Sequence, residues 1–189
     1  MHYPMFSHAS KPPTSAEERK AEERVTALYC ESELPVDEAW AALTEYIHLW
    51  WPRELLQSEE SHVYITDENL LEETENGEII VLGNILHNIP NDVLSFDPAP
   101  GSSLVRFVGG REEPGSLSFI LDNLVADSAE AIEETKILTI VEITSGTYSS
   151  SELDDEAELG LWARHKELGR ILIGAYSRFI GAVSQEEVI

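Results

Sequence analysis

The segment at residues 35–52, PVDEAWAALTEYIHLWWP, constrains the fold of this chain more than any other segment. Proline suits the first turn of a helix, and Asp37 and Glu38 suit the positive end of the helix dipole. Pro52 is expected to end the helix, because a residue before proline disfavours helical geometry. The segment is therefore predicted to be one amphipathic helix. Its apolar face comprises Val36, Trp40, Leu43, Ile47 and Trp50.

Strands are predicted on both sides of this helix. Residues 25–34 alternate polar side chains with β-branched and aromatic ones, which favours a first strand. Residues 62–144 have no useful helical periodicity, and turn signals such as Asn76-Gly77 separate their short apolar runs. Seven strands in series with short turns predict an antiparallel meander. The predicted strands are HVYIT, ENLLEET, EIIVLGNIL, DVLSFD, SLVRFV, SLSFILDNLV and TKILTIVEIT.

A second amphipathic helix is predicted over residues 155–183. Its apolar face comprises Leu161, His165, Leu168, Leu172, Ala175 and Phe179, widened by Trp162, Ile171 and Ile180. Gly160, Gly169 and Gly174 each weaken helix propensity by up to about 1 kcal/mol. We expect these glycines to allow close approach to the sheet or to a ligand.

The order of strand, helix, strands and long C-terminal helix predicts an α+β helix-grip domain. In this architecture a curved antiparallel sheet wraps around the long C-terminal helix, with one or two short helices after the first strand, and leaves a cavity between sheet and helix. The length of 189 residues favours a single domain over residues 16–184. Residues 1–15 are expected to form a flexible lead-in and residues 185–189 a C-terminal tail.

The charge of the chain excludes two classes of partner. Its 36 Asp and Glu residues outnumber 12 Lys and Arg residues, for a formal net charge of −24. Such a surface repels phosphate backbones and anionic headgroups, so we expect neither nucleic-acid binding nor membrane-surface binding. The acidic excess could serve solubility, including adaptation to a salty cytoplasm, or it could steer a cationic ligand or basic partner.

The sequence favours a cytoplasmic location. It has no run of about 18 apolar residues, so no membrane insertion is expected, and its first residues lack the apolar core of a secretion signal. The single cysteine, Cys30, excludes an intramolecular disulfide, agrees with a reducing compartment and is expected to be buried in a strand. A monomer and a homodimer both remain possible.

No motif for a metal or a cofactor is present. The histidines after the lead-in, His48, His62, His87 and His165, have no metal-binding spacing, and there is no CxxC. A nucleophile elbow, a P-loop and a dinucleotide fingerprint are also absent. We therefore expect no cofactor and no metal.

Four segments resemble the START-like, or SRPBCC, superfamily, and more closely its branch named after the activator of the heat-shock chaperone ATPase. They are VDEAWAALTEYIHLWWP, NGEIIVLGNI followed by PNDVLSFD, TKILTIVEITSG, and GLWARHKELGRIL. The resemblance covers about residues 24–182. The closing helix of that branch begins with Gly-Trp, whereas this chain has Gly160-Leu161-Trp162. The resemblance does not extend to the extra domain of the chaperone-activating members, so their role is not expected here.

The resemblance implies a ligand cavity, since superfamily members bind lipids, polyketides, hormones or other hydrophobic molecules, and some are cyclases or hydrolases. Such a cavity would be lined by inward strand residues and one face of the last helix. Strand alternation places Leu117, Phe119 and Leu121 on one face, as it does Leu94 and Phe96. The predicted ligand-binding residues are Trp51, Tyr64, Phe96, Leu117, Phe119, Leu121, Trp162, His165 and Leu168. The alternative is that these side chains fill the core.

Three polar residues interrupt apolar patterns. His165 is either a hydrogen-bonded core histidine or a ligand anchor or general base. Glu142 and Arg106 interrupt predicted strands and are expected to point outward. If both pointed inward, they could pair and orient a polar substrate group.

The leading hypothesis is a protein that binds a hydrophobic or amphipathic small molecule. One alternative is an enzyme of the cyclase or hydrolase kind, with His165 or an inward carboxylate as the base, although no catalytic residue is assigned. A buried titratable group with a shifted pKa would favour the enzyme. The other alternative is an interaction module that meets a basic partner through its acidic surface or a sheet edge, which exposed Trp50 and Trp51 would favour.

Overall fold

The computed structural model describes residues 24–109, 115–125, 137–147 and 155–186. Its centre is an antiparallel sheet in the order β2-β3-β4-β5-β6-β7-β1-β8. The strands are β1 (Arg24–Ser32), β2 (His62–Ile65), β3 (Asn69–Glu73), β4 (Ile79–Ile89), β5 (Val93–Pro98), β6 (Leu117–Val125), β7 (Ile137–Thr147) and β8 (Val183–Glu186). The helices are α1 (Val36–Thr44), α2 (Ile47–Trp50), the 3₁₀ turn η1 (Arg53–Leu55), α3 (Ser103–Phe107) and α4 (Asp155–Phe179).

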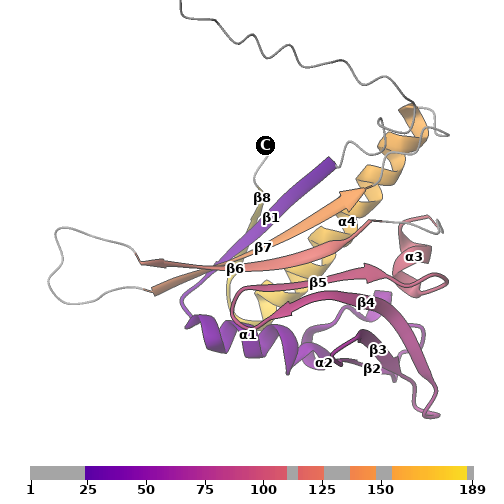
Figure 1. Ribbon diagram of the computed structural model, residues 1–189, viewed down its shortest axis with the longest axis horizontal. Coiled ribbons are helices and arrows are strands. Elements are labelled where there is room, and N and C mark those ends of the chain that lie inside the picture. The colour runs from indigo at the N-terminus through magenta and orange to yellow at the C-terminus, as the bar shows by residue number, and fades with distance from the viewer. Residues whose placement is uncertain (1–23, 110–114, 126–136, 148–154, 187–189) are drawn as a thin grey trace, which may run out of the picture.

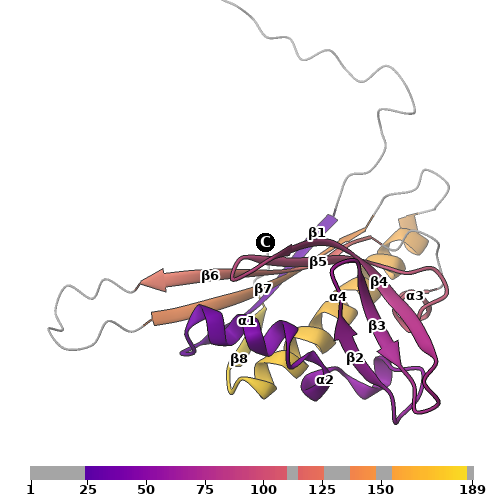
Figure 2. The same ribbon diagram turned by 60° about the horizontal axis from the view of Figure 1, so that its bottom comes forward.

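The sheet curves around the long helix α4 (Figure 1). Figure 2 shows α1, α2 and α4 together on one face of the sheet. The buried apolar residues lie between the sheet and these helices. This arrangement confirms the predicted α+β helix-grip fold, with its short helices after the first strand.

The prediction of one unbroken helix over residues 35–52 is wrong. The chain turns at Tyr46, whose φ of −103° and ψ of 16° are not helical, and α2 begins after it. The indole Nε1 of Trp50 then donates a hydrogen bond to the carbonyl oxygen of Ala42 over 2.8 Å, which holds α2 against α1. The turn therefore lets both Trp50 and Trp51 enter the core.

The run SLVRFV is a helix, α3, and the prediction of a strand there is wrong. The hydroxyl of Ser102 caps it by accepting a hydrogen bond from the amide of Val105 over 3.3 Å. The hydroxyl of Ser103 also donates to the carbonyl of Leu55 over 2.5 Å, which ties α3 to η1. Arg106 is exposed on this helix, as expected. The side chain of Glu142 lies outside the described part, so the structure describes no contact between these two side chains.

The last helix ends earlier than predicted. It stops at Phe179, and the amide of Ala182 donates to the carbonyl of Ser177 over 2.8 Å. Gly181 has a φ of +71°, so the glycine supplies the left-handed residue of a Schellman-type helix end. The chain then reverses into β8, which pairs with β1, and residues 185 and 186 belong to that strand and not to a tail. Phe179 is 40% exposed, so the prediction that it lies on the buried face is wrong.

The predicted turn at Asn76-Gly77 is confirmed, and Asn91 forms a second turn. Gly77, with a φ of +77°, lies in the connection between β3 and β4, and Asn91, with a φ of +63°, lies between β4 and β5. Glycine and asparagine tolerate this left-handed conformation better than other residues do. The acidic segment at residues 126–134 lies outside the described residues.

Candidate functional site

The candidate site is the apolar interior between α4 and strands β5 and β6. The inward face of the sheet carries Leu94 and Phe96 on β5, which pair in register with Phe119 and Leu117 on β6. All four side chains are buried, and Leu121 continues the same face. The alternation read from the sequence is therefore confirmed for both strands.

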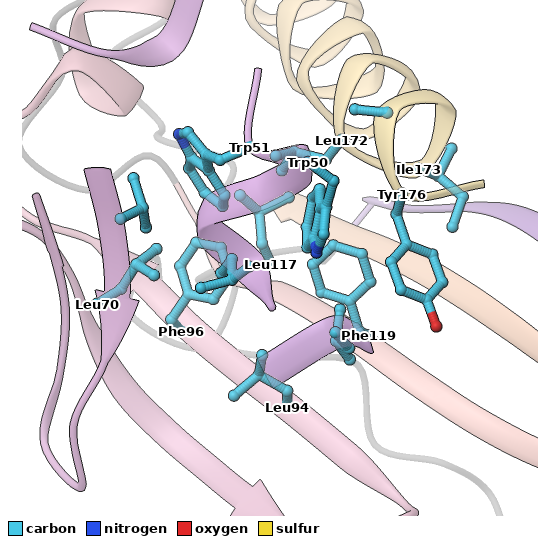
Figure 3. Packing of buried hydrophobic residues seen from close by; sticks show 14 of the residues in the cluster. Trp50, Trp51, Leu70, Leu94, Phe96, Leu117, Phe119, Leu172, Ile173 and Tyr176 are labelled. Atoms are coloured by element: carbon cyan, nitrogen blue, oxygen red, sulfur yellow. The ribbon is translucent and has the colours of Figure 1, made fainter. Parts of the chain in front are cut away.

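The opposite wall is one face of α4. Leu161, His165, Leu168, Leu172 and Tyr176 are all buried and follow helical spacing. Figure 3 shows the rings of Trp50, Phe119 and Tyr176 next to one another, with Ile173 on the far side of Tyr176. A sheet face and a helix face thus enclose the candidate site.

Aromatic rings form one end of this interior. The ring of Trp50 lies 5.4 Å from that of Tyr176 and 6.2 Å from that of Phe119, both edge-to-face, measured between centroids. The Trp51 ring lies 5.9 Å from that of Trp50. These separations are typical of favourable aromatic pairs, so the ends of α2 and α4 are held firmly to β6.

His165 is the residue on this helix face whose buried polar atoms have no described hydrogen-bond partner. Its side chain is fully buried, and neither Nδ1 nor Nε2 has a hydrogen-bond partner among the described residues. Burial lowers the pKa of His165 to about 4, so the imidazole is neutral at pH 7 and offers one donor and one acceptor. An unpaired buried polar group costs about 1–3 kcal/mol. The alternative of a hydrogen-bonded core histidine is therefore not supported by any described contact.

Trp51 has a further buried polar atom without a described partner. Its ring is buried at 6% exposure, and its Nε1 has no hydrogen-bond partner within the described ranges. In Figure 3 this nitrogen points away from Trp50 and Phe119. Trp51 is thus another buried ring with a hydrogen-bond donor that no described group satisfies.

Two carboxylates that the sequence analysis did not single out are also buried. Glu72 is fully buried on β3, where its Oε1 accepts hydrogen bonds from the amides of Gln57 and Ser58, at 2.8 Å and 3.3 Å, and from the hydroxyl of Ser61. Strand alternation places Glu72 on the same face as the buried Leu70, and this signal could have identified it. Burial also raises the pKa of the half-buried Asp97. Glu72 anchors residues 57–61, which is a structural role.

The structure brings together most of the predicted site residues. Tyr64 is not among them, because it lies half-buried on β2 next to the fully buried Val63, and adjacent strand residues face opposite sides. The side chain of Trp162 lies outside the described part. Trp51, Phe96, Leu117, Phe119, Leu121 and Leu168 belong to one buried cluster, and His165 is buried on the same face of α4 as Leu168.

No family model matches this sequence, and no curated protein matches it. Several solved structures are similar. A protein of unknown function from Staphylococcus aureus has 9% identity and a TM-score of 0.40, with 85% of this chain and 91% of that chain covered. XoxI from Bacillus cereus has 13% identity and a TM-score of 0.45, with 82% and 94% covered. CalU16 from Micromonospora echinospora has 16% identity and a TM-score of 0.37, with 84% and 87% covered.

Two further features are absent from the described residues. None of their helices is both long enough and apolar enough to cross a membrane. They also contain no group of three or more His, Cys, Asp or Glu residues placed to hold a metal ion.

Proposed function

We propose that the protein binds a hydrophobic or amphipathic small molecule between the sheet and α4, with His165 as its polar anchor. The observation that supports this proposal is a fully buried imidazole whose two nitrogens have no hydrogen-bond partner among the described residues, on a helix face whose other buried residues are Leu161, Leu168, Leu172 and Tyr176. Ligand sites of this kind combine apolar walls with a few placed polar groups. Apolar burial would supply affinity, and the imidazole would fix orientation.

The protonation state of the imidazole restricts which chemical groups of a ligand would bind to it. A neutral imidazole donates one hydrogen bond and accepts one, which suits a hydroxyl or a carbonyl group. The Trp51 indole adds a donor, and its buried location favours the same kind of group. A charged headgroup is disfavoured there, because an ion buried without a counter-ion carries a large desolvation cost. We therefore propose a neutral ligand that is mostly apolar and carries one or two oxygen atoms.

The lowered pKa favours binding over catalysis. A base with a pKa of about 4 accepts a proton weakly at neutral pH, so His165 suits hydrogen bonding better than proton abstraction. The interaction-module alternative is less favoured, since Trp50 and Trp51 are 5% and 6% exposed and not surface residues.

We also propose that the chain is a member of the START-like superfamily and of its chaperone-activator-named branch. The support is the set of four resembling segments, together with the helix-grip arrangement in which they lie. A cytoplasmic location is proposed on the same footing, and the buried thiol of Cys30, which forms no disulfide, agrees with it. A monomer or a homodimer would each be compatible with an internal ligand site.

NMR of the imidazole nitrogens tests whether His165 anchors the ligand. Long-range ¹H–¹⁵N spectra would follow His165 while 1-decanol, or decane as the matched alkane, is added, and the variant His165→Gln would identify the signal. We expect 1-decanol to shift the ring nitrogen that its hydroxyl group contacts, and decane to leave both ring nitrogens in place. Equal responses to both compounds, or no response, would overturn the assignment of His165 as the anchor.

A further inference from the structure

A groove runs along the outer side of α4, where that helix meets α2 and η1. It has a volume of about 500 Å³, within the range of small-molecule sites. Its apolar part includes Trp50, Ile171 and Ala175, and its charged rim includes three arginines, Arg53, Arg170 and Arg178. It lies on the side of α4 away from His165, so it is separate from the interior described above.

The charge of this rim is unusual for the chain. The whole sequence has 12 Lys and Arg residues against 36 Asp and Glu residues, yet three arginines gather here beside only two carboxylates, Glu54 and Glu167. Glu167 forms an ion pair with Arg170. Arg53 and Arg178 form no ion pair with any described carboxylate. Two guanidinium groups therefore remain available to a ligand.

Gly174 keeps the groove open. It lines the groove, and a Cβ atom added to it would have no other atom within 4 Å. Glycine is the least favourable residue in a helix interior after proline. Of the two expected uses of Gly174, close approach to the sheet is not observed, and the space beside it belongs to the groove.

We propose that this groove binds a small molecule with an oxyanion head and a short apolar body. The planar guanidinium matches carboxylate and phosphate oxygens in a bidentate manner. The apolar body would lie against Trp50 and Ile171. The acidic surface elsewhere repels anions, but charges beyond about 8 Å are screened at physiological ionic strength, so the nearest guanidinium groups dominate.

Trp50 provides the reporter for this proposal. It is buried, its Nε1 is bonded to the Ala42 carbonyl, and it separates the groove from Phe119 and Tyr176 in the interior. A molecule seated in the groove would change the environment of the indole ring. The Trp50 indole signal in ¹H–¹⁵N spectra, assigned with Trp50→Phe, therefore reports binding here.

The experiment titrates octanoate, octyl phosphate and 1-octanol into the full chain at physiological salt. We expect at least one of the two anions to shift the Trp50 signal, and 1-octanol to bind at least about tenfold more weakly. The preferred anion distinguishes a carboxylate ligand from a phosphate ligand. Equal affinity for 1-octanol, or no shift with either anion, would overturn the proposal.

Substitutions test whether the anion binds in this groove. Gly174→Leu places a side chain in the groove and should reduce the anion affinity at least tenfold, whereas Gly160→Leu, in open space on the same helix and outside the groove, should not change it. The double variant Arg53→Gln/Arg178→Gln should also weaken binding at least tenfold, with Arg106→Gln as the matched control. Unchanged affinity in both groove variants would overturn the proposal. The response of His165 to 1-decanol tests the interior site separately, so failure of one proposal can be distinguished from failure of the other.

Discussion

The hydroxyl of Tyr176 donates a hydrogen bond to the backbone carbonyl oxygen of Ala39 over 2.8 Å, and both residues are fully buried. This contact joins α4 to α1, which are 137 residues apart at this point. Burial and the nearby Cys30 raise the pKa of Tyr176, so the phenol keeps its proton and remains a donor. The Tyr176 ring also packs against Trp50 and Phe119, and it thus fixes the position of α4 under the sheet.

Removal of this hydroxyl should have a measurable but limited cost. Tyr176→Phe keeps the ring contacts and loses the hydrogen bond, so the free energy of unfolding should fall by about 1 kcal/mol. Tyr176→Leu should cost more, because the ring contacts are lost too. Urea unfolding would measure both. Equal stability of the Phe variant and the wild type would show that this bond contributes nothing net.

The pH dependence of stability should carry the signature of His165. Burial lowers its pKa to about 4 from its ordinary value of 6.5, so between these two pH values the unfolded chain binds a proton that the native protein does not. Stability is therefore complete above about pH 6.5, falls as the pH drops toward about 4, and loses nothing more from this group below that. The loss amounts to roughly 3 kcal/mol, because each pH unit between the two pKa values contributes about 1.36 kcal/mol.

The variant His165→Leu isolates this effect, since the acidic residues titrate in both proteins. The wild type should lose stability relative to the variant as the pH falls through this window, while at pH 7 the variant should be at least as stable. Urea unfolding at several pH values measures the difference. Parallel curves for the two proteins would contradict the assignment of a neutral buried imidazole.

The buried carboxylate of Glu72 should be important for the segment that it anchors. Glu72→Ala leaves the amides of Gln57 and Ser58 without their acceptor, so the free energy of unfolding should fall by about 1–3 kcal/mol. Glu73→Ala is the matched control on the opposite face of β3. Its side chain is 39% exposed and lies 3.6 Å from His62, and such surface pairs contribute at most about 1 kcal/mol. Equal losses in the two variants would argue against the anchoring role.

Two glycine substitutions should change stability in opposite directions. A Cβ atom on Gly83 would lie 2.9 Å from the carbonyl oxygen of Asp97 and 3.0 Å from the Phe96 ring, so Gly83→Ala should destabilise the protein by about 1–3 kcal/mol. Gly174→Ala meets no other atom and removes a helix-interior glycine, so it should stabilise by up to about 1 kcal/mol. Thermal unfolding measures both. A stabilised Gly83→Ala protein would show that β4 and β5 have room to separate.

Local patterns were sufficient to predict the fold and which residues of β6 share a face. Period-two alternation placed Leu117, Phe119 and Leu121 correctly, because one face of their strand is buried and the other is not. The same reasoning failed for SLVRFV, where β-branched and aromatic residues favour a strand. There the Ser102 cap and the contact between Ser103 and Leu55 stabilise a helix instead. Contacts between distant segments outweighed local preference at that point.

The candidate sites were less predictable because they depend on distant contacts. His165 could be singled out as a polar residue on an apolar face, but its lack of partners depends on all the elements around it. The groove combines Arg53 with Arg178, which come together only when α4 packs beside η1. Charge patterning along the sequence showed an acidic chain and gave no sign of this local exception.

Native mass spectrometry of protein purified without detergent tests the central claim most directly. The proposal predicts a population whose mass exceeds the chain mass by that of a neutral, mostly apolar molecule. The excess mass should disappear on denaturation and be reduced in His165→Leu, and not in His48→Leu, which changes an exposed histidine. A bare chain mass in every preparation, even after incubation with a total lipid extract, would contradict a ligand-binding role for this interior.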